Sequence, residues 1–151
     1  MLIETCTGAM VEDWLELRQA LWPEADEQQL RLETSALVGR PDRAIALLVR
    51  EHALAVGFAE ATLRHDYVNG CATSPVGFLE GIYVRPAWRR RGVARRLCDA
   101  IAAWAAGLGC SELASDTEID NRASQAMHRA LGFEQMERVV CFRRRLPRDD
   151  R

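Results

Sequence analysis

The stretch WRRRGVARRL, residues 88–97, combines five arginines with a glycine in a pattern suited to binding phosphate. Pro86 and Gly92 separate an apolar run at 76–84 from a helical pattern, so the glycine is expected near a helix N-terminus. Free backbone N–H groups and the positive end of the helix dipole make such a terminus an anion site. A side chain at Gly92, or a large one at Ala94, would hinder a phosphate from approaching the backbone. The run therefore predicts a pyrophosphate site, with a solvated helix start as the alternative.

Two carboxylates and one aromatic residue are further candidates for chemistry. Glu80 stands inside an apolar strand pattern, where a buried carboxylate without a partner is costly, so a substrate-facing position is favoured over plain exposure. It could accept a proton, directly or through water, or hold a cation. Asp116 follows a short strand pattern near the point where parallel strands would splay; a turn or helix cap is its alternative role. Tyr67, in a polar loop, is suited to contact a sugar ring.

The elements that must position these residues follow from hydrophobic periodicity and from Gly and Pro punctuation. Helices are predicted after Thr7 up to Trp22, and at 27–38, 92–108 and 121–131. Strands are predicted at 2–6, 44–50, 53–63, 76–84, 110–115, 133–136 and 139–146. With no repeat and no linker, the chain is expected to form one α/β domain, residues 1–151, with a mixed sheet.

Composition excludes several classes of protein. The net charge is −2, and although arginines gather at 89–96 and 143–145, only Trp88 and Phe142 adjoin them, and the pI is about 5.9. A nucleic-acid-binding module would combine a high pI with interleaved aromatic residues, so no nucleic acid partner is expected. No apolar stretch approaches the roughly 20 residues of a membrane span, and no membrane association is expected.

The cysteines and the remaining polar residues point to no metal and no disulfide. The five cysteines are odd in number and include no CxxC pair. Apolar neighbours around Cys98, Cys110 and Cys141 predict small core residues. No His, Cys or Asp cluster has metal spacing, and no Ser-His-Asp arrangement is evident. A reduced, cytoplasmic compartment is the expectation.

Two motifs resemble those of the GNAT superfamily of acetyl-CoA-dependent N-acetyltransferases. Residues 89–94 match its R/Q-x-x-G-x-G/A motif, which follows a strand ending in V-x-P, here residues 84–86. Its second signature is an Asn, an aromatic residue seven positions later, and then Gly-Phe; here Asn121, His128 and residues 132–133 fill it. The superfamily usually has Tyr at the position of His128, where it commonly protonates the departing thiolate. His128 is a candidate for that role, with a solvated helix position as the alternative.

A closer resemblance is to the aminoglycoside 6'-N-acetyltransferases. It is carried by LWP (21–23), RHDYVNG (64–70), FLEGI (78–82) and ASDT (114–117). The resemblance implies a GNAT-type fold, an acyl-CoA N-acyltransferase fold with a mixed, mostly antiparallel sheet flanked by helices. It also implies direct transfer of acetyl from acetyl-CoA to the 6'-amino group of the antibiotic in a ternary complex, which confers resistance.

The resemblance also implies which residues form the site. The predicted catalytic residues are Glu80, Asp116 and His128. The positions that line the antibiotic in the family correspond to Trp22, Tyr67, Glu80, Asp116 and Glu137. Those expected to line acetyl-CoA are Ile82, Tyr83, Val84, Arg89, Arg90, Arg91, Gly92, Val93, Ala94, Arg95 and Asn121. In the family, a backbone amide near Ile82 polarises the thioester carbonyl where this strand bulges away from the next. Relatives commonly dimerise through sheet edges and C-terminal strands, so a homodimer is expected, with 139–146 as the pairing strand.

A second reading keeps the fold and changes the acceptor to another amine, such as a polyamine or a protein N-terminus. A set of acidic residues favours a polycation over a neutral peptide: Asp66, Glu80, Asp116, Glu118, Asp120 and Glu137. A polyamine fits that charge equally well, and the phrases HDYVNG and FLEGI favour the aminoglycoside.

Overall fold

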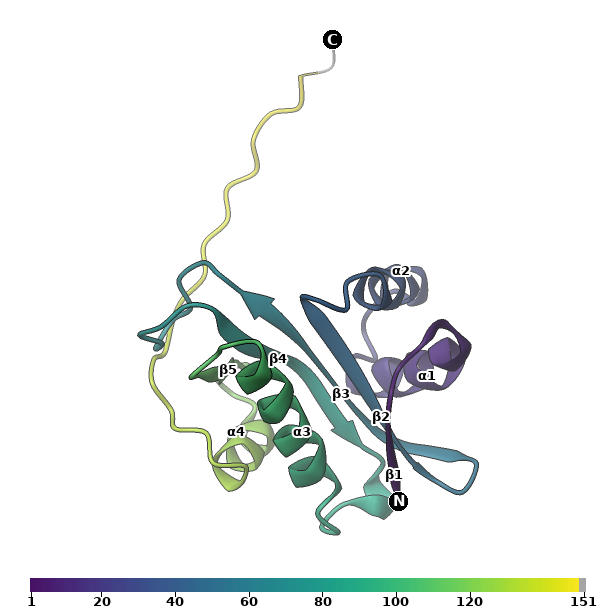
Figure 1. The fold of residues 1–151 in the computed structure, drawn as a ribbon. Helices are drawn as coiled ribbons and strands as arrows, with labels where there is room; N and C mark the ends of the chain where they lie inside the picture. Colours follow the sequence, from purple (N-terminus) through teal and green to yellow (C-terminus); the bar gives the residue numbers. More distant parts are fainter. Residues whose placement is uncertain (150–151) are drawn as a thin grey trace.

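The computed structural model describes residues 1–149 and contains a mixed sheet with helices on both faces (Figure 1). The strands of the described residues lie in chain order across the sheet: β1 (Leu2–Thr5), β2 (Ala44–Glu51), β3 (Leu54–Arg64), β4 (Val76–Val84) and β5 (Leu113–Ser115). β1 to β4 pair antiparallel, and β4 pairs with β5 in parallel. The α/β class and the mostly antiparallel sheet are as predicted.

The helices divide between the two faces of the sheet. They are α1 (Val11–Leu21), α2 (Glu27–Val38), α3 (Val93–Gly107) and α4 (Arg122–Ala130), with short 3-10 turns at Gly8–Met10 and Pro86–Trp88. Figure 1 shows α1 and α2 on one face, and α3 with α4 on the other. No helix among the described residues is both long enough and apolar enough to cross a bilayer.

Each face of the sheet has its own hydrophobic core. The apolar stripe of α3 packs on side chains of β2, β3 and β4, and Leu97 and Ile101 are fully buried there. On the opposite face, Trp14 of α1 packs against Phe58 of β3, and both are fully buried. Burial of these large side chains stabilises the two helical layers on the sheet.

A buried ion pair fixes α1 to the sheet. Arg18 donates from Nε and Nη2 to the carboxylate of Glu60 at 3.0 and 2.9 Å, and the Trp14 indole donates to the same carboxylate at 3.0 Å. Arg18 also donates to the carbonyl of Leu30, which ties α2 to α1. Burial raises the pKa of the Glu60 carboxyl, and the bonds from Arg18 and Trp14 oppose that rise.

A β-bulge in β4 changes which residues face α1 and α2. Glu60 pairs with Gly81, but the next residue of β3, Ala61, pairs with Leu79, so Glu80 is the extra residue of β4. Leu79 and Ile82 both belong to the core beneath α3. The two residues between them, Glu80 and Gly81, therefore both face the α1–α2 side.

The strands predicted at 133–136 and 139–146 are absent from the described residues, and this prediction was wrong. Residues 133–149 form no helix or strand; Phe133 and Met136 still contact the rest of the chain, and the last part of the segment extends away from the sheet (Figure 1). Phe142 is 93% exposed and Val140 79%, and Cys141, predicted to be in the core, is exposed as well. β propensity makes a strand only where the segment pairs with a neighbouring strand, and among the described residues this segment pairs with none.

Candidate active site

Glu80 is held at the bulge by two donors that meet at one oxygen. The Thr62 hydroxyl donates to Oε1 at 2.6 Å and Arg64 Nη2 donates to the same atom at 2.9 Å. The Arg64 guanidinium lies over the ring of Phe78, 3.5 Å from its centroid, and this stacking fixes the arginine in turn. Among the described residues no donor binds Oε2, so the second oxygen is available to a ligand.

Trp22 lies beside Glu80 because β4 has a glycine at the next position. A Cβ atom added to Gly81 would lie 2.7 Å from Cη2 of Trp22, so only glycine lets the indole pack this closely on the strand. The indole also packs edge-on against Phe58, and the Arg18 guanidinium lies 5.0 Å from its ring centre. Trp22, the predicted aromatic contact, thus packs on the strand at the position next to Glu80, the predicted cation-binding carboxylate.

The loop that carries Tyr67 is anchored near its start and near its end. Val68 is buried in a small cluster with Val76, Phe78 and Ala114, while the neighbouring Tyr67 is 76% exposed. The loop therefore packs through Val68 on the face that carries Phe78, and the neighbouring Tyr67 side chain is exposed to solvent.

Glu112 holds the far end of this loop. Its carboxylate accepts from the backbone N–H of Ala72 at 2.9 Å and of Thr73 at 2.8 Å, and from the Thr73 hydroxyl. The hydrogen bond from the Thr73 hydroxyl contributes most to lowering the pKa of the Glu112 carboxyl. The predictions from sequence passed over this anchor.

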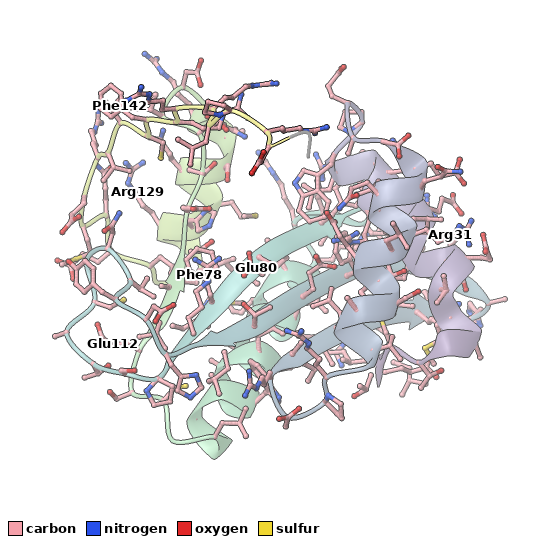
Figure 2. The ribbon with its side chains drawn as sticks, turned by 90° about the horizontal axis from the view of Figure 1, so that it is seen from above. Arg31, Phe78, Glu80, Glu112, Arg129 and Phe142 are labelled. Atoms are coloured by element: carbon pink, nitrogen blue, oxygen red, sulfur yellow. The ribbon has the colours of Figure 1, made fainter. Side chains whose placement is uncertain are left out.

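Asp116 and Glu137 lie at the border of the same face. Asp116 is exposed and directly follows β5, whose Ala114 packs under the Tyr67 loop. Glu137 is exposed and follows Met136, whose side chain lies against Gly70; a Cβ there would be 2.6 Å from Met136. Figure 2 shows Glu80 and Phe78 on the sheet between the α2 side, marked by Arg31, and the C-terminal segment, marked by Phe142. Glu80 and Trp22 thus face the same side of the sheet, and the segments that carry Tyr67, Asp116 and Glu137 reach its border through Val68, Ala114 and Met136.

The predicted cofactor residues lie at the end of β4, in the turn after it and at the start of α3, except Asn121, which precedes α4. The side chains of Ile82 and Val84 are buried in the core beneath α3, so only their backbone can meet a ligand. Tyr83 points to the other face, where it packs beside Trp14 and Phe58. Cofactor contacts through this strand are therefore backbone contacts.

Gly92 caps α3 in the left-handed conformation, with φ 78°, and Arg90 also has a positive φ of 61°. A Cβ at Gly92 would meet nothing within 4 Å, so the backbone angle rather than crowding requires glycine in the free chain. The first N–H bonded within the helix is that of Arg96, to the carbonyl of Gly92. Within residues 1–149 the N–H groups of Val93 to Arg95 have no hydrogen-bond partner, so they can bind an anion in this open space.

Several of the arginines and Asn121 have structural partners. Arg89 Nε donates to the carbonyl of Val84 at 2.8 Å, Arg91 lies over Trp88, and Arg95 donates to the carbonyl of Ala130. Asn121 caps α4 by accepting from the N–H of Ser124 at 3.1 Å. The side chains of Arg89 and Arg95 therefore shape the turn, and their charge adds to the field around it.

His128 lies on the α3–α4 side of the sheet and makes side-chain contacts that the sequence did not indicate. Its Nε2 lies 2.8 Å from Ser115 Oγ, and its Nδ1 lies 2.7 Å from the carbonyl oxygen of Ser124. The ring also packs edge-on against Phe133 at 5.3 Å. His128 is thus half-buried and fixed, unlike a solvated helix residue. No group of three or more His, Cys, Asp or Glu within the described residues could hold a metal ion.

Comparison with known proteins gives concordant matches. Residues 9–133 match the acetyltransferase (GNAT) family. The chain is 48% identical over 141 residues to an aminoglycoside N(6')-acetyltransferase type 1 from Stenotrophomonas maltophilia, covering 93% of this chain and 91% of that protein. It is 45% identical to the enzyme of the same name from Acinetobacter genomosp. 13, with 97% and 99% covered.

Solved structures of similar proteins share the architecture. The aminoglycoside antibiotic 6'-N-acetyltransferase AAC(6')-IG from Acinetobacter haemolyticus, in its apo form, has a TM-score of 0.94 and 45% identity, with 97% of this chain and 100% of that chain covered. AAC(6')-Iy in complex with a bisubstrate analogue, CoA-S-monomethyl-acetylneamine, has a TM-score of 0.91 and 42% identity, with 96% and 98% covered.

Proposed function

The chain belongs to the GNAT family of acetyltransferases, and from that premise we propose that it transfers the acetyl group of acetyl-CoA to the 6'-amino group of aminoglycosides. The observation that carries the proposal is the bulge, which presents Glu80 beside Trp22 with one carboxylate oxygen free for an ammonium group. Relatives at 45–48% identity over most of the chain bear the name of that activity. Acetylation of a 6'-ammonium removes a positive charge from the antibiotic, and resistance is the proposed consequence.

On the acceptor side, the proposed substrate contacts are Trp22, Tyr67, Glu80, Asp116 and Glu137. The Tyr67 ring is exposed and free to pack on a sugar ring, and the three carboxylates attract a polycation. Glu80 or Asp116 takes up the proton that the amine loses, directly or through water. Arg64 and Thr62 already occupy Oε1 of Glu80, so this chemistry is assigned to Oε2.

On the cofactor side, acetyl-CoA supplies an activated acetyl thioester when bound. The free N–H groups at the start of α3 and the arginines of the turn are proposed to hold its pyrophosphate. Backbone groups of Ile82 to Val84 are proposed to orient the thioester and polarise its carbonyl, and Asn121 borders the same side. The residues present fit the group, because a Cβ placed at Gly92 would meet no other group of the described residues within 4 Å, so the space before α3 is open. Direct transfer within a ternary complex needs no covalent intermediate, and this is the mechanism we propose.

We also propose a homodimer in which residues 139–146 of each chain pair with the partner. The support is the exposure of Val139, Val140, Phe142 and Leu146, an apolar row with no partner in the described residues. β5 is at the sheet edge, so a backbone edge is available for such pairing. Light scattering should give twice the monomer mass at micromolar concentration, and truncation after Arg138 should give the monomer. A monomeric full-length chain would contradict the proposal.

Cytoplasmic localisation is proposed on chemical grounds. The cysteines of the described residues are all free, as a reducing compartment would keep them. Acetyl-CoA is likewise a metabolite of that compartment.

The activity is tested by thiol release from acetyl-CoA in the presence of kanamycin, tobramycin, gentamicin, apramycin or spermidine. Acetylation of the first two, with NMR locating the new amide at the 6'-nitrogen, is the expected result. Turnover of spermidine alone would replace the aminoglycoside with a polyamine, and acetylation at another nitrogen would correct the position.

A further inference from the structure

The carboxylate of Glu80 is bound at one of its two oxygens by side chains of the neighbouring strand. The Thr62 hydroxyl and Arg64 Nη2 both donate to Oε1, at 2.6 and 2.9 Å, and both residues belong to β3. Two donors at one oxygen restrict rotation of the carboxyl group, so they also decide where the second oxygen, Oε2, points. Neither Thr62 nor Arg64 is among the site residues predicted from sequence.

Strand register places both donors on the face of the sheet that Glu80 occupies. Thr62 pairs directly with Phe78 of β4, and directly paired residues point to the same face. Side chains alternate along a strand, so Arg64 shares that face with Thr62 and with Glu60, whose carboxylate is bonded to α1. This is the α1–α2 side, to which the bulge directs Glu80. The backbone therefore sets the positions of both donors and of their acceptor.

Each donor is itself held in a fixed direction. The Arg64 guanidinium lies 3.5 Å from the centroid of the Phe78 ring, and that ring is only 5% exposed, in a cluster with Val68 and Val76. A planar guanidinium stacked on a ring keeps its N–H groups in one direction, unlike a lysine ammonium group. Thr62 is β-branched, which restricts its side chain to few rotamers. The two hydrogen bonds therefore hold Oε1 rigidly.

The charge of Arg64 has the wrong sign for attracting the acceptor. Arg64 is a cation beside the carboxylate that is proposed to meet an ammonium group, so its charge opposes the approach of that group. Attraction of a polycation alone would favour a neutral residue at position 64. The orientation of Glu80 is an effect that only the hydrogen bond can supply, and it opposes the effect of the charge.

We propose that Thr62 and Arg64 are positioning residues, which hold Oε1 of Glu80 so that Oε2 is directed at the acceptor amine. The inference rests on the proposed acetyl transfer and on the acceptor role of Glu80 within it. A carboxylate can hold an ammonium group or take up its proton only from within hydrogen-bond reach, so its direction limits both actions. Thr62 and Arg64 act through Glu80 and need no contact with the substrate.

The role is tested by kcat/KM for tobramycin, or for spermidine if only that amine is acetylated. Arg64→Met still covers the Phe78 ring but has no donor and no charge, and Thr62→Val suits a strand but lacks the hydroxyl. Each should lower kcat/KM at least about tenfold, because misplacing a group by about 1 Å can cost about 100-fold. Thr62→Ser keeps a hydroxyl and should restore most of the value. The control Arg31→Met should keep the parental value, since Arg31 is equally exposed, at 43%, and pairs with Glu12 outside the site.

Double variants show whether the two residues act through Glu80. Glu80→Gln removes the charge whose direction they set, so adding Arg64→Met or Thr62→Val to it should change kcat/KM by no more than about twofold. If Thr62 and Arg64 contacted the substrate themselves, the losses would multiply instead.

The geometry is tested without turnover, by ¹H–¹⁵N spectra of the guanidinium groups in the full-length protein. An Arg64 guanidinium that is bonded to Oε1 and stacked on Phe78 should rotate slowly and give separate Nη signals. Arg64→Met identifies these signals by their loss. Glu80→Ala removes the acceptor and should average them.

The outcomes separate this inference from the proposed function. If the unaltered enzyme acetylates no amine tested, the proposed function fails, and the guanidinium spectra alone decide the positioning. Averaged Arg64 signals in the unaltered protein would overturn the inference. So would parental or raised kcat/KM in Arg64→Met or Thr62→Val, equal losses in Thr62→Val and Thr62→Ser, or losses that multiply with Glu80→Gln.

Discussion

Replacing Glu80 with glutamine deletes the charge at the centre of the proposed acceptor site and keeps its shape. The amide oxygen can still accept from Thr62 and Arg64, so the bulge stays supported. The ion pair that is lost is partly exposed, with Glu80 29% and Arg64 43% accessible, and such pairs contribute about 0–1 kcal/mol. For a domain of this size that corresponds to a fall in Tm of at most about 4 °C.

The effect on catalysis should be larger than the effect on folding. If Glu80 contacts an ammonium group of the antibiotic, kcat/KM should fall at least tenfold, about 1.4 kcal/mol of transition-state stabilisation. Affinity for acetyl-CoA should barely change, because the proposed cofactor site lies at the start of α3. A rise in KM alone would show that Glu80 only holds the cation. A fall in kcat alone that recovers at high pH would show that it accepts the proton. Asp116→Asn is expected to lower kcat/KM by a similar factor.

The assay is steady-state thiol release with each aminoglycoside, paired with thermal unfolding and with calorimetric titration of acetyl-CoA. The matched control is Glu12→Gln, which also removes a carboxylate from an arginine pair, since Glu12 lies 2.6 Å from Arg31 on the outer face of α1 and α2. That variant should keep parental kinetics. Parental kinetics of Glu80→Gln and Asp116→Asn toward every aminoglycoside would refute the reasoning, because both carboxylates would then be structural and the acceptor assignment wrong.

Three further predictions address the cofactor site, the loop and the core. Gly92→Glu should abolish acetyl-CoA binding by calorimetry, because it puts a negative charge on the anion site and a side chain at φ 78°; unchanged affinity would remove that site. The Thr73 bond lowers the pKa of Glu112 below the unfolded value of about 4.3, so the loop anchor is present above that pH and is lost as pH falls through the folded pKa. The NMR signal of the Thr73 amide should therefore move in acid, and an acid shift that persists in Glu112→Gln would disprove the assignment. Arg18→Met should lower the free energy of unfolding in urea by about 3–5 kcal/mol by leaving the Glu60 carboxylate buried and unpaired, and parental stability would show that the pair does not hold α1.

The elements that the sequence predicted best are those bounded by glycine or proline. The helix at 27–38 and the strand at 76–84 have the predicted bounds, because Gly39 ends the helix and Pro75 and Pro86 flank the strand. The prediction of the C-terminal strands was wrong because local sequence does not decide whether a strand finds a partner. Their apolar residues have strand propensity, but pairing depends on a neighbour that the local sequence does not specify.

The candidate site was predictable where one residue contradicted its surroundings. Glu80 stood out as a charge in an apolar strand, yet Glu60 in FAEATL has the same signal and was passed over. Glu60 is a structural residue, 2% exposed and paired with Arg18, whereas Glu80 keeps an oxygen free. The two glutamates differ in strand register: Glu60 is paired with Gly81, whereas Glu80 is the extra residue of the bulge. The contact of Ser115 with His128 depends on how α4 docks against β5, which no periodicity encodes.

The bulge also explains how one strand could serve both halves of a transfer reaction. Leu79 and Glu80 are neighbours in β4, yet the Leu79 carbonyl leads through Ser115 to His128 on the α3–α4 side, while the Glu80 carboxylate faces the α1–α2 side. Acetyl transfer must remove a proton from the amine and deliver one to sulfur, and a single group near both atoms could return the proton to the amine. The Glu80 carboxylate and the His128 imidazole lie on opposite faces of the sheet, so in the proposed reaction we expect the two proton transfers to stay apart. With His128 in the acid role that the family resemblance implies, we expect the losses in Glu80→Gln and His128→Asn to multiply in the double variant, because the two groups would act on different protons.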